Sequence, residues 1–98
     1  MTKEIIEITF EEYLILKKKK ISFIAIDIRE VVEFSDYNLG DKNIPAHEIT
    51  DNIEYLKTFE NIAVVCSNGT RSHIMARVIQ KKIPSAQIYH LTEGIIKG

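Results

Sequence analysis

Two short runs of consecutive apolar residues, 23–26 and 62–65, mark the interior of the predicted fold. Runs of this length are typical of strands that are buried on both faces. Shorter apolar groups within residues 5–8 and 88–91 predict a first and a last strand. The central strands are therefore expected to lie inside the molecule, with the segments between them covering the sheet.

A helix is expected directly after the first strand. Thr9 stands three residues before Glu12, and this spacing is that of a capping box at a helix N-terminus. The side chains expected on its buried side are Phe10, Tyr13 and Leu14. The lysine run at 17–20 fits a solvated last turn, where cations suit the helix dipole.

The remaining segments continue the alternation of strand and helix. We expect a helical turn at 31–34, an irregular stretch over 35–43, a short helix within 53–59 and a longer helix over 71–82. Pro84 stops the last helix. Its predicted apolar face consists of Ile74, Met75, Val78 and Ile79. This order predicts an α/β domain with a mostly parallel central sheet, flanked by helices on both faces.

Composition narrows the class of protein. With 98 residues, 45% hydrophobic and 28% charged, the chain has the make-up of one globular domain over residues 1–98. A net charge of -1 argues against nucleic-acid binding, and the apolar runs are too short to cross a membrane. No secretory signal pattern opens the sequence, and the single cysteine cannot form an internal disulfide, so we expect a cytoplasmic protein.

That cysteine, Cys66, follows the second apolar run. A free cysteine in such a place is often a small buried hydrophobe. Here, however, small or turn-forming residues join the strand to a helix, and they are Ser67, Asn68, Gly69 and Thr70. Such a loop can point its N–H groups inward as an anion nest, to which Arg71 adds a cation and Ser72 a hydroxyl. These surroundings lower a cysteine pKa from about 8.5 to roughly 3.5–7.5 and predict a thiolate nucleophile.

The chain resembles the rhodanese-like family from about residue 5 to residue 94. Residues 66–72, Cys-Ser-Asn-Gly-Thr-Arg-Ser, match the family's Cys-x-x-Gly-x-Arg-Ser loop. Residues 27–34 are similar to its Asp-Val-Arg-x-x-x-Glu-Phe motif, and residues 43–49 to its Asn-Ile-Pro-x-x-Glu-Leu motif. The family's histidine before Asn-Ile-Pro and its tryptophan near the end are both missing.

The resemblance implies sulfur transfer. Cys66 would take a sulfane sulfur from a small anion such as thiosulfate as a persulfide, then pass it to a thiophilic acceptor, a thiol or a protein. The implied cradle is the backbone from Ser67 to Arg71, with Arg71 closing it. Asp27 is an expected neighbour of the loop, and Arg29 is expected to form a structural ion pair with Glu33. The resemblance implies no metal and no organic cofactor.

Two other functions stay open at this point. Phosphatases and arsenate reductases of the related fold have a loop similar to Cys-x5-Arg, with five residues between the cysteine and the arginine. Here four residues separate Cys66 from Arg71, and this shorter loop favours sulfur chemistry over phosphate chemistry. The domain could also be a sulfur carrier or docking module that works only with a protein partner. The histidines match no zinc pattern. His73, one turn into the last helix, could face the mouth of the site, whereas His47 and His90 are interpreted as structural.

Overall fold

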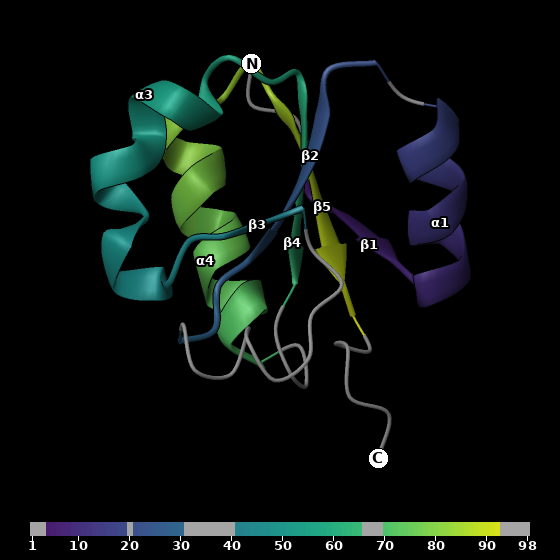
Figure 1. The fold of residues 1–98 in the computed structure, drawn as a ribbon, viewed down its shortest axis with the longest axis horizontal. Coiled ribbons are helices and arrows are strands. Elements are labelled where there is room, and N and C mark those ends of the chain that lie inside the picture. The colour runs from purple at the N-terminus through teal and green to yellow at the C-terminus, as the bar shows by residue number, and fades with distance from the viewer. Residues whose placement is uncertain (1–3, 20, 31–40, 66–69, 93–98) are drawn as a thin grey trace.

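Five parallel strands form the centre of the computed structural model, which describes residues 4–19, 21–30, 41–65 and 70–92 (Figure 1). The strands are β1 (Ile6–Ile8), β2 (Phe23–Asp27), β3 (Lys42–Asn43), β4 (Asn61–Val65) and β5 (Gln87–Leu91). They lie in the order β1-β5-β4-β2-β3, and each neighbouring pair is parallel. The carboxyl ends of all described strands therefore meet at one edge of the sheet.

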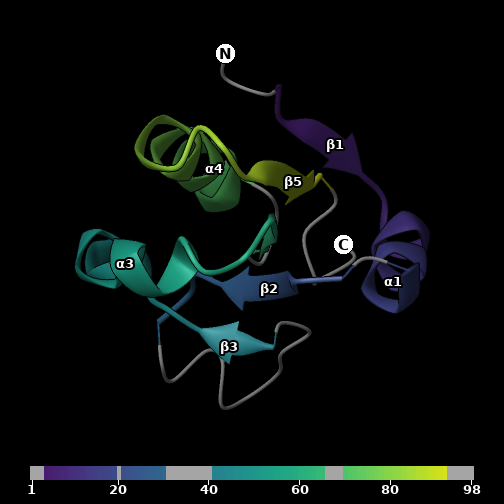
Figure 2. The ribbon, with the colours of Figure 1, turned by 90° about the horizontal axis from the view of Figure 1, so that it is seen from above.

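Helices cover both faces of the sheet, as the alternating pattern predicts. Helix α1 (Phe10–Lys19) lies on one face, and α3 (Ile53–Leu56) and α4 (Thr70–Lys82) lie on the other (Figure 2). Two 3-10 turns, Ala46–Glu48 and Thr50–Asn52, lead into α3. The predicted α/β architecture is confirmed. Within the described part of the chain, no helix is long and apolar enough to span a membrane.

The two layers of the core follow from the two-residue period of a strand. Ile24 and Ile26 of β2 pack with α3 and α4, in a cluster that also contains Leu56 and Ile79. Ala25 faces the opposite way, into a second cluster on the side of α1. That second cluster consists of Ile8, Tyr13, Ala25, Ala63, Val65, Tyr89 and Leu91. The small alanine side chains in this second cluster leave room for its tyrosine rings, which bury the most apolar surface there.

The predicted capping box at the start of α1 is present. The Thr9 backbone N–H donates to Glu12 Oε1 at 2.8 Å, and the Glu12 N–H donates to Thr9 Oγ1 at 3.2 Å. Tyr13 is buried as predicted and Phe10 is half-buried, but Leu14 is 43% exposed, so its predicted burial is wrong. The helix contacts the sheet along a narrow stripe centred on Tyr13, and the next residue points about 100° away from it.

We expect Thr9→Ala to lower the free energy of unfolding by about 1 kcal/mol, because the variant leaves a helix N–H without its acceptor. Urea unfolding followed by circular dichroism measures the change. The matched control is Thr50→Ala, since Thr50 is exposed and makes no side-chain hydrogen bond to any residue that the structure describes. The control should change stability by less than about 0.5 kcal/mol. Equal losses in the two variants would contradict a stabilising role of the cap.

Helix α4 buries Ile79 as predicted, but the centre of its buried face is rotated away from the predicted one. Its buried side chains recur at helical spacing and are Ser72, Ala76, Ile79 and, just after its end, Ile83. Ile74 is 59% exposed, and its assignment to the apolar face is wrong. Met75 and Val78 are half-buried at the two margins. The prediction followed the bulkiest apolar residues, whereas close packing of α4 on the sheet places small side chains at the centre of the contact.

Strand β3 was not predicted, because Lys42 and Asn43 fall in the stretch expected to be irregular. Hydrogen bonds to β2 define this short edge strand. The Asp41 N–H donates to the Ala25 carbonyl at 2.7 Å, and the Ile44 N–H donates to the Asp27 carbonyl at 3.0 Å. Two side-chain bonds of 2.9 Å add to this pairing, from the Ala25 N–H to the Asp41 carboxylate and from Asn43 Nδ2 to the Asp27 carbonyl. A two-residue strand held by polar side chains has no hydrophobic alternation to reveal it. The turn predicted at 31–34 and the tail after residue 92 lie outside the described residues.

Candidate active site

The frame of the candidate site is the junction between β4 and α4. Strand β4 ends at Val65, and α4 begins at Thr70, so the predicted strand and helix flank the four residues between them. Those four residues, Cys66, Ser67, Asn68 and Gly69, lie outside the described residues. Their roles as nucleophile and anion-binding loop therefore stay predictions, and the described neighbours show what surrounds the two ends of this segment.

Asp27 and Arg29 form a buried ion pair beside the end of β4. Asp27 is 0% exposed and Arg29 is 2% exposed. Arg29 Nε lies 3.0 and 3.1 Å from the two carboxylate oxygens of Asp27, and a terminal guanidinium nitrogen lies 2.8 Å from Oδ2. The predicted partner, Glu33, lies outside the described residues. Asp27 pairs in register with Val65, so this ion pair stands next to the residue that precedes Cys66.

The backbone around this ion pair is held by its neighbours. The Ile28 N–H donates to the Val65 carbonyl at 3.1 Å, which extends the β2–β4 ladder by one residue. Asn43 Nδ2 donates to the carbonyls of Asp27 and Arg29, both at 2.9 Å. These contacts explain why an asparagine suits position 43, since a single amide group donates to two backbone carbonyls, one of which, that of Asp27, also accepts from the Ile44 N–H. These hydrogen bonds tie the end of β2 to β4 and to β3 at the edge where the strand ends meet.

The first turn of α4 brings in side chains from the opposite side. Arg71 is exposed, whereas Ser72 is fully buried. Ser72 Oγ lies 2.7 Å from His90 Nε2, and His90 Nδ1 lies 2.6 Å from Glu7 Oε1. Thr92 Oγ1 also donates to Glu7 Oε1, at 2.9 Å. A continuous polar chain therefore runs from the start of α4 through β5 to β1.

The sequence pattern does not predict this polar chain. It indicates only a structural role for His90 and assigns no role to Glu7. Glu7 and His90 are partners in the parallel register of β1 and β5, although 83 residues separate them along the chain. A histidine inside a predicted strand, flanked by apolar residues, was the signal that could have prompted a search for a partner. The identity of that partner depends on strand order, which the pattern alone does not specify.

The carboxylate of Glu7 stays charged in this setting. Partial burial raises the pKa of Glu7, but hydrogen bonds from His90 and Thr92 and the charges of His90 and His73 outweigh burial and lower that pKa overall. Ionised Glu7 accepts a hydrogen bond from the N–H of His90 Nδ1, and the other ring nitrogen, Nε2, lies within hydrogen-bond distance of the Ser72 hydroxyl.

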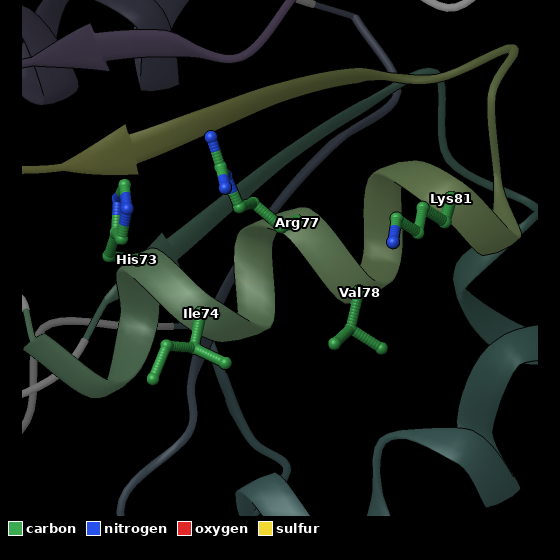
Figure 3. A pocket seen from close by; sticks show the side chains of 5 residues that line it. All are labelled: His73, Ile74, Arg77, Val78 and Lys81. Atoms are coloured by element: carbon green, nitrogen blue, oxygen red, sulfur yellow. The ribbon is translucent and has the colours of Figure 1, made fainter.

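Two pockets open beside α4. The first, of about 320 Å³, is lined by His73, Ile74, Arg77, Val78 and Lys81 (Figure 3). The second, of about 280 Å³, is lined by Glu4, Ile5, Glu7, His73, Arg77 and Gln80. His73 borders both pockets, and Figure 3 shows it projecting from the helix toward β5. Its ring centre lies 5.7 Å from that of His90.

Comparison with known proteins identifies the fold. No protein-family model matches the sequence, and no curated protein matches it significantly. Among solved structures, a rhodanese-related protein from Thermoplasma volcanium is 22% identical with a TM-score of 0.77, over 92% of this chain and 86% of that one. A Staphylococcus saprophyticus protein is 18% identical with a TM-score of 0.76, over 92% and 89%. A single-domain sulfurtransferase from Saccharomyces cerevisiae is 20% identical with a TM-score of 0.70, over 97% and 89%. The predicted rhodanese-like fold is confirmed.

Proposed function

We propose that this protein is a rhodanese-type sulfurtransferase that carries sulfur as a persulfide on Cys66. The observation that supports the proposal most is the junction of β4 and α4 within a rhodanese-like fold, because the sequence Cys-x-x-Gly-x-Arg-Ser starts directly after β4 and runs into the first turn of α4. One structural neighbour is a single-domain sulfurtransferase. The proposal extends that activity to this chain on the strength of the loop sequence and its frame.

The proposed reaction has two displacement steps. The Cys66 thiolate attacks the outer sulfur of thiosulfate, the sulfur–sulfur bond of the donor breaks, and sulfite leaves with the bonding electron pair. Cys66 then carries one extra sulfur as a persulfide anion. A thiophilic acceptor, such as cyanide or a thiolate, attacks that outer sulfur and restores the Cys66 thiolate. Neither step needs a redox cofactor or a metal, since each is a transfer of sulfur between nucleophiles.

The surroundings of the junction suit an anionic intermediate. The N-terminus of α4, a helix of 13 residues, carries a partial positive charge of roughly 0.5. Arg71 adds a full positive charge on the first turn. Negative charge on the persulfide and on departing sulfite would be stabilised at this end of the helix. The acceptor in the cell would be a thiol or a protein thiol, and a reducing cytoplasm would keep Cys66 ready for the next cycle.

The test compares sulfur transfer with phosphate hydrolysis on the same preparation. We expect turnover of thiosulfate and cyanide to thiocyanate and sulfite, with no hydrolysis of an aryl phosphate above a blank. Hydrolysis of the aryl phosphate without thiocyanate formation would replace the proposal with a phosphatase. A persulfide that forms from thiosulfate but reaches only a protein thiol, and never cyanide, would instead identify a sulfur carrier.

A further inference from the structure

Three potential metal ligands from separate elements converge beside the start of α4. Glu7 lies on β1, His73 on α4 and His90 on β5. One ligand atom from each side chain lies within 4.8 Å of those of the other two. Imidazole nitrogen and carboxylate oxygen are the donors that zinc and its neighbours in the first transition series accept together. The sulfur-transfer reaction proposed above uses none of these three side chains.

Two of these side chains already have the outer partners that metal ligands require. The second ring nitrogen of His90 is held by Ser72 Oγ at 2.7 Å, and Ser72 is fully buried. The carboxylate of Glu7 accepts a hydrogen bond from Thr92 Oγ1 at 2.9 Å. Outer hydrogen bonds of this kind fix the ring orientation and basicity of ligating histidines and carboxylates. Ser72 therefore aims His90 Nδ1 toward Glu7, which is the geometry that a shared ion needs.

The cluster is also accessible from solvent. Glu7 and His73 line the pocket of about 280 Å³, so an ion and a water ligand have a route to them. Two carboxylates, Glu4 and Glu7, line this pocket beside one permanent cation, Arg77, and the imidazole of His73. Figure 3 shows His73 extending from α4 toward the end of β5, where His90 lies.

We propose that Glu7, His73 and His90 bind a divalent transition-metal ion of the zinc type, with water in the remaining position. The ion would replace the hydrogen bond between His90 Nδ1 and Glu7 Oε1. With the ion on Nδ1, Nε2 of His90 would carry the ring N–H and donate a hydrogen bond to Ser72 Oγ. The Nδ1 to Glu7 distance of 2.6 Å would lengthen to accommodate bonds of about 2.0–2.2 Å to the ion.

Binding would join the edge strand β1 to the interior. β1 is three residues long, and its described strand neighbour is β5 alone. An ion shared by β1, α4 and β5 would cross-link these three elements. We therefore expect Zn²⁺ to raise the temperature of unfolding as well as to bind, since a ligand that binds only the folded state stabilises it.

Isothermal titration with Zn²⁺, together with the visible absorption of Co²⁺, tests the site on the whole chain. We expect one ion per chain and a Co²⁺ spectrum with nitrogen and oxygen ligands. His73→Ala and Glu7→Gln should each weaken binding by more than about 100-fold, beyond the roughly 10–100-fold expected for loss of an outer partner in Ser72→Ala. Both ligand variants change exposed side chains, so they should fold like the parent, which circular dichroism checks.

Two controls separate this site from other donors on the molecule. His47→Ala removes an exposed histidine that lies beside Glu30 and Glu48, and binding should be unchanged. Cys66→Ser removes the thiol and should also leave binding unchanged, which makes the metal site independent of the proposed sulfur chemistry. The proposal is overturned if Zn²⁺ does not bind, if His73→Ala and Glu7→Gln bind as the parent does, or if Cys66→Ser abolishes binding.

Discussion

Arg29→Met is expected to lower the free energy of unfolding by about 3–5 kcal/mol, the usual cost of removing one partner from a buried ion pair. Asp27 would remain fully buried with its carboxylate deprived of three contacts from the guanidinium. Because the free energy of unfolding of a small domain is only about 5–15 kcal/mol, this single change could remove a large part of the stability of the protein. Denaturant unfolding at neutral pH measures the loss directly.

A double variant and a surface variant serve as controls for this prediction. Asp27→Leu combined with Arg29→Met replaces both charges with apolar side chains and should recover part of the stability, since no buried charge is then left alone. Lys17→Ala removes one partner of the exposed pair with Asp41, whose atoms lie 3.0 Å apart, and should cost at most about 1 kcal/mol. A loss in Arg29→Met no larger than in Lys17→Ala would contradict the importance assigned to the buried pair.

Cys66→Ala is expected to abolish sulfur loading and to lower thiocyanate formation by at least about 10³-fold, as loss of the nucleophile does in covalent catalysis. Intact mass spectrometry after thiosulfate treatment should show one added sulfur atom on the parent chain and none on the variant. Cyanide or a reducing thiol should remove that sulfur. A mass gain that persists in Cys66→Ala would place the chemistry on another residue and end the assignment.

The rate of sulfur loading in arginine variants tests the role of Arg71. Arg71→Lys keeps the positive charge but loses the planar fork of donors, so it should load sulfur more slowly although Cys66 is intact. Arg77→Lys is the matched control, because it makes the same change on the same helix, nearly two turns further on. Equal loading rates for the parent, Arg71→Lys and Arg77→Lys would mean that charge alone suffices at position 71.

The elements of this fold could be predicted where the residues that define them are neighbours in sequence. The apolar runs at 23–26 and 62–65 coincide with β2 and β4, and Thr9 and Glu12 mark the start of α1. The capping interaction at the start of α1 spans only three residues. The two strands are so completely buried that every side chain of each run is apolar. The frame of the candidate site, between β4 and α4, follows from the same local signals.

Features that depend on tertiary partners could not be predicted. The exposure of Ile74 depends on which face of α4 packs on the sheet. The large side chain of Ile74 predicts that it makes this contact, but the small Ala76 makes it instead. The contact between His90 and Ser72 spans 18 residues, and that between His90 and Glu7 spans 83. The packing of α4 against β5 brings Ser72 to His90, and the placement of β5 next to β1 brings His90 to Glu7. A single sequence carries the residue types but not this adjacency.

The strand order also determines when the sheet can be completed as the chain is synthesised. Among the described strands β1 leaves the ribosome first, yet its neighbour in the sheet is β5, the last of them to leave. Until β5 has been synthesised, β1 has no strand to pair with, and the side chain of Ile8, which is 3% exposed in the finished fold, stays unburied. Nascent chains released before residue 91 would therefore lack a complete sheet. Such incomplete chains present an unpaired strand and should be substrates for chaperones and proteases.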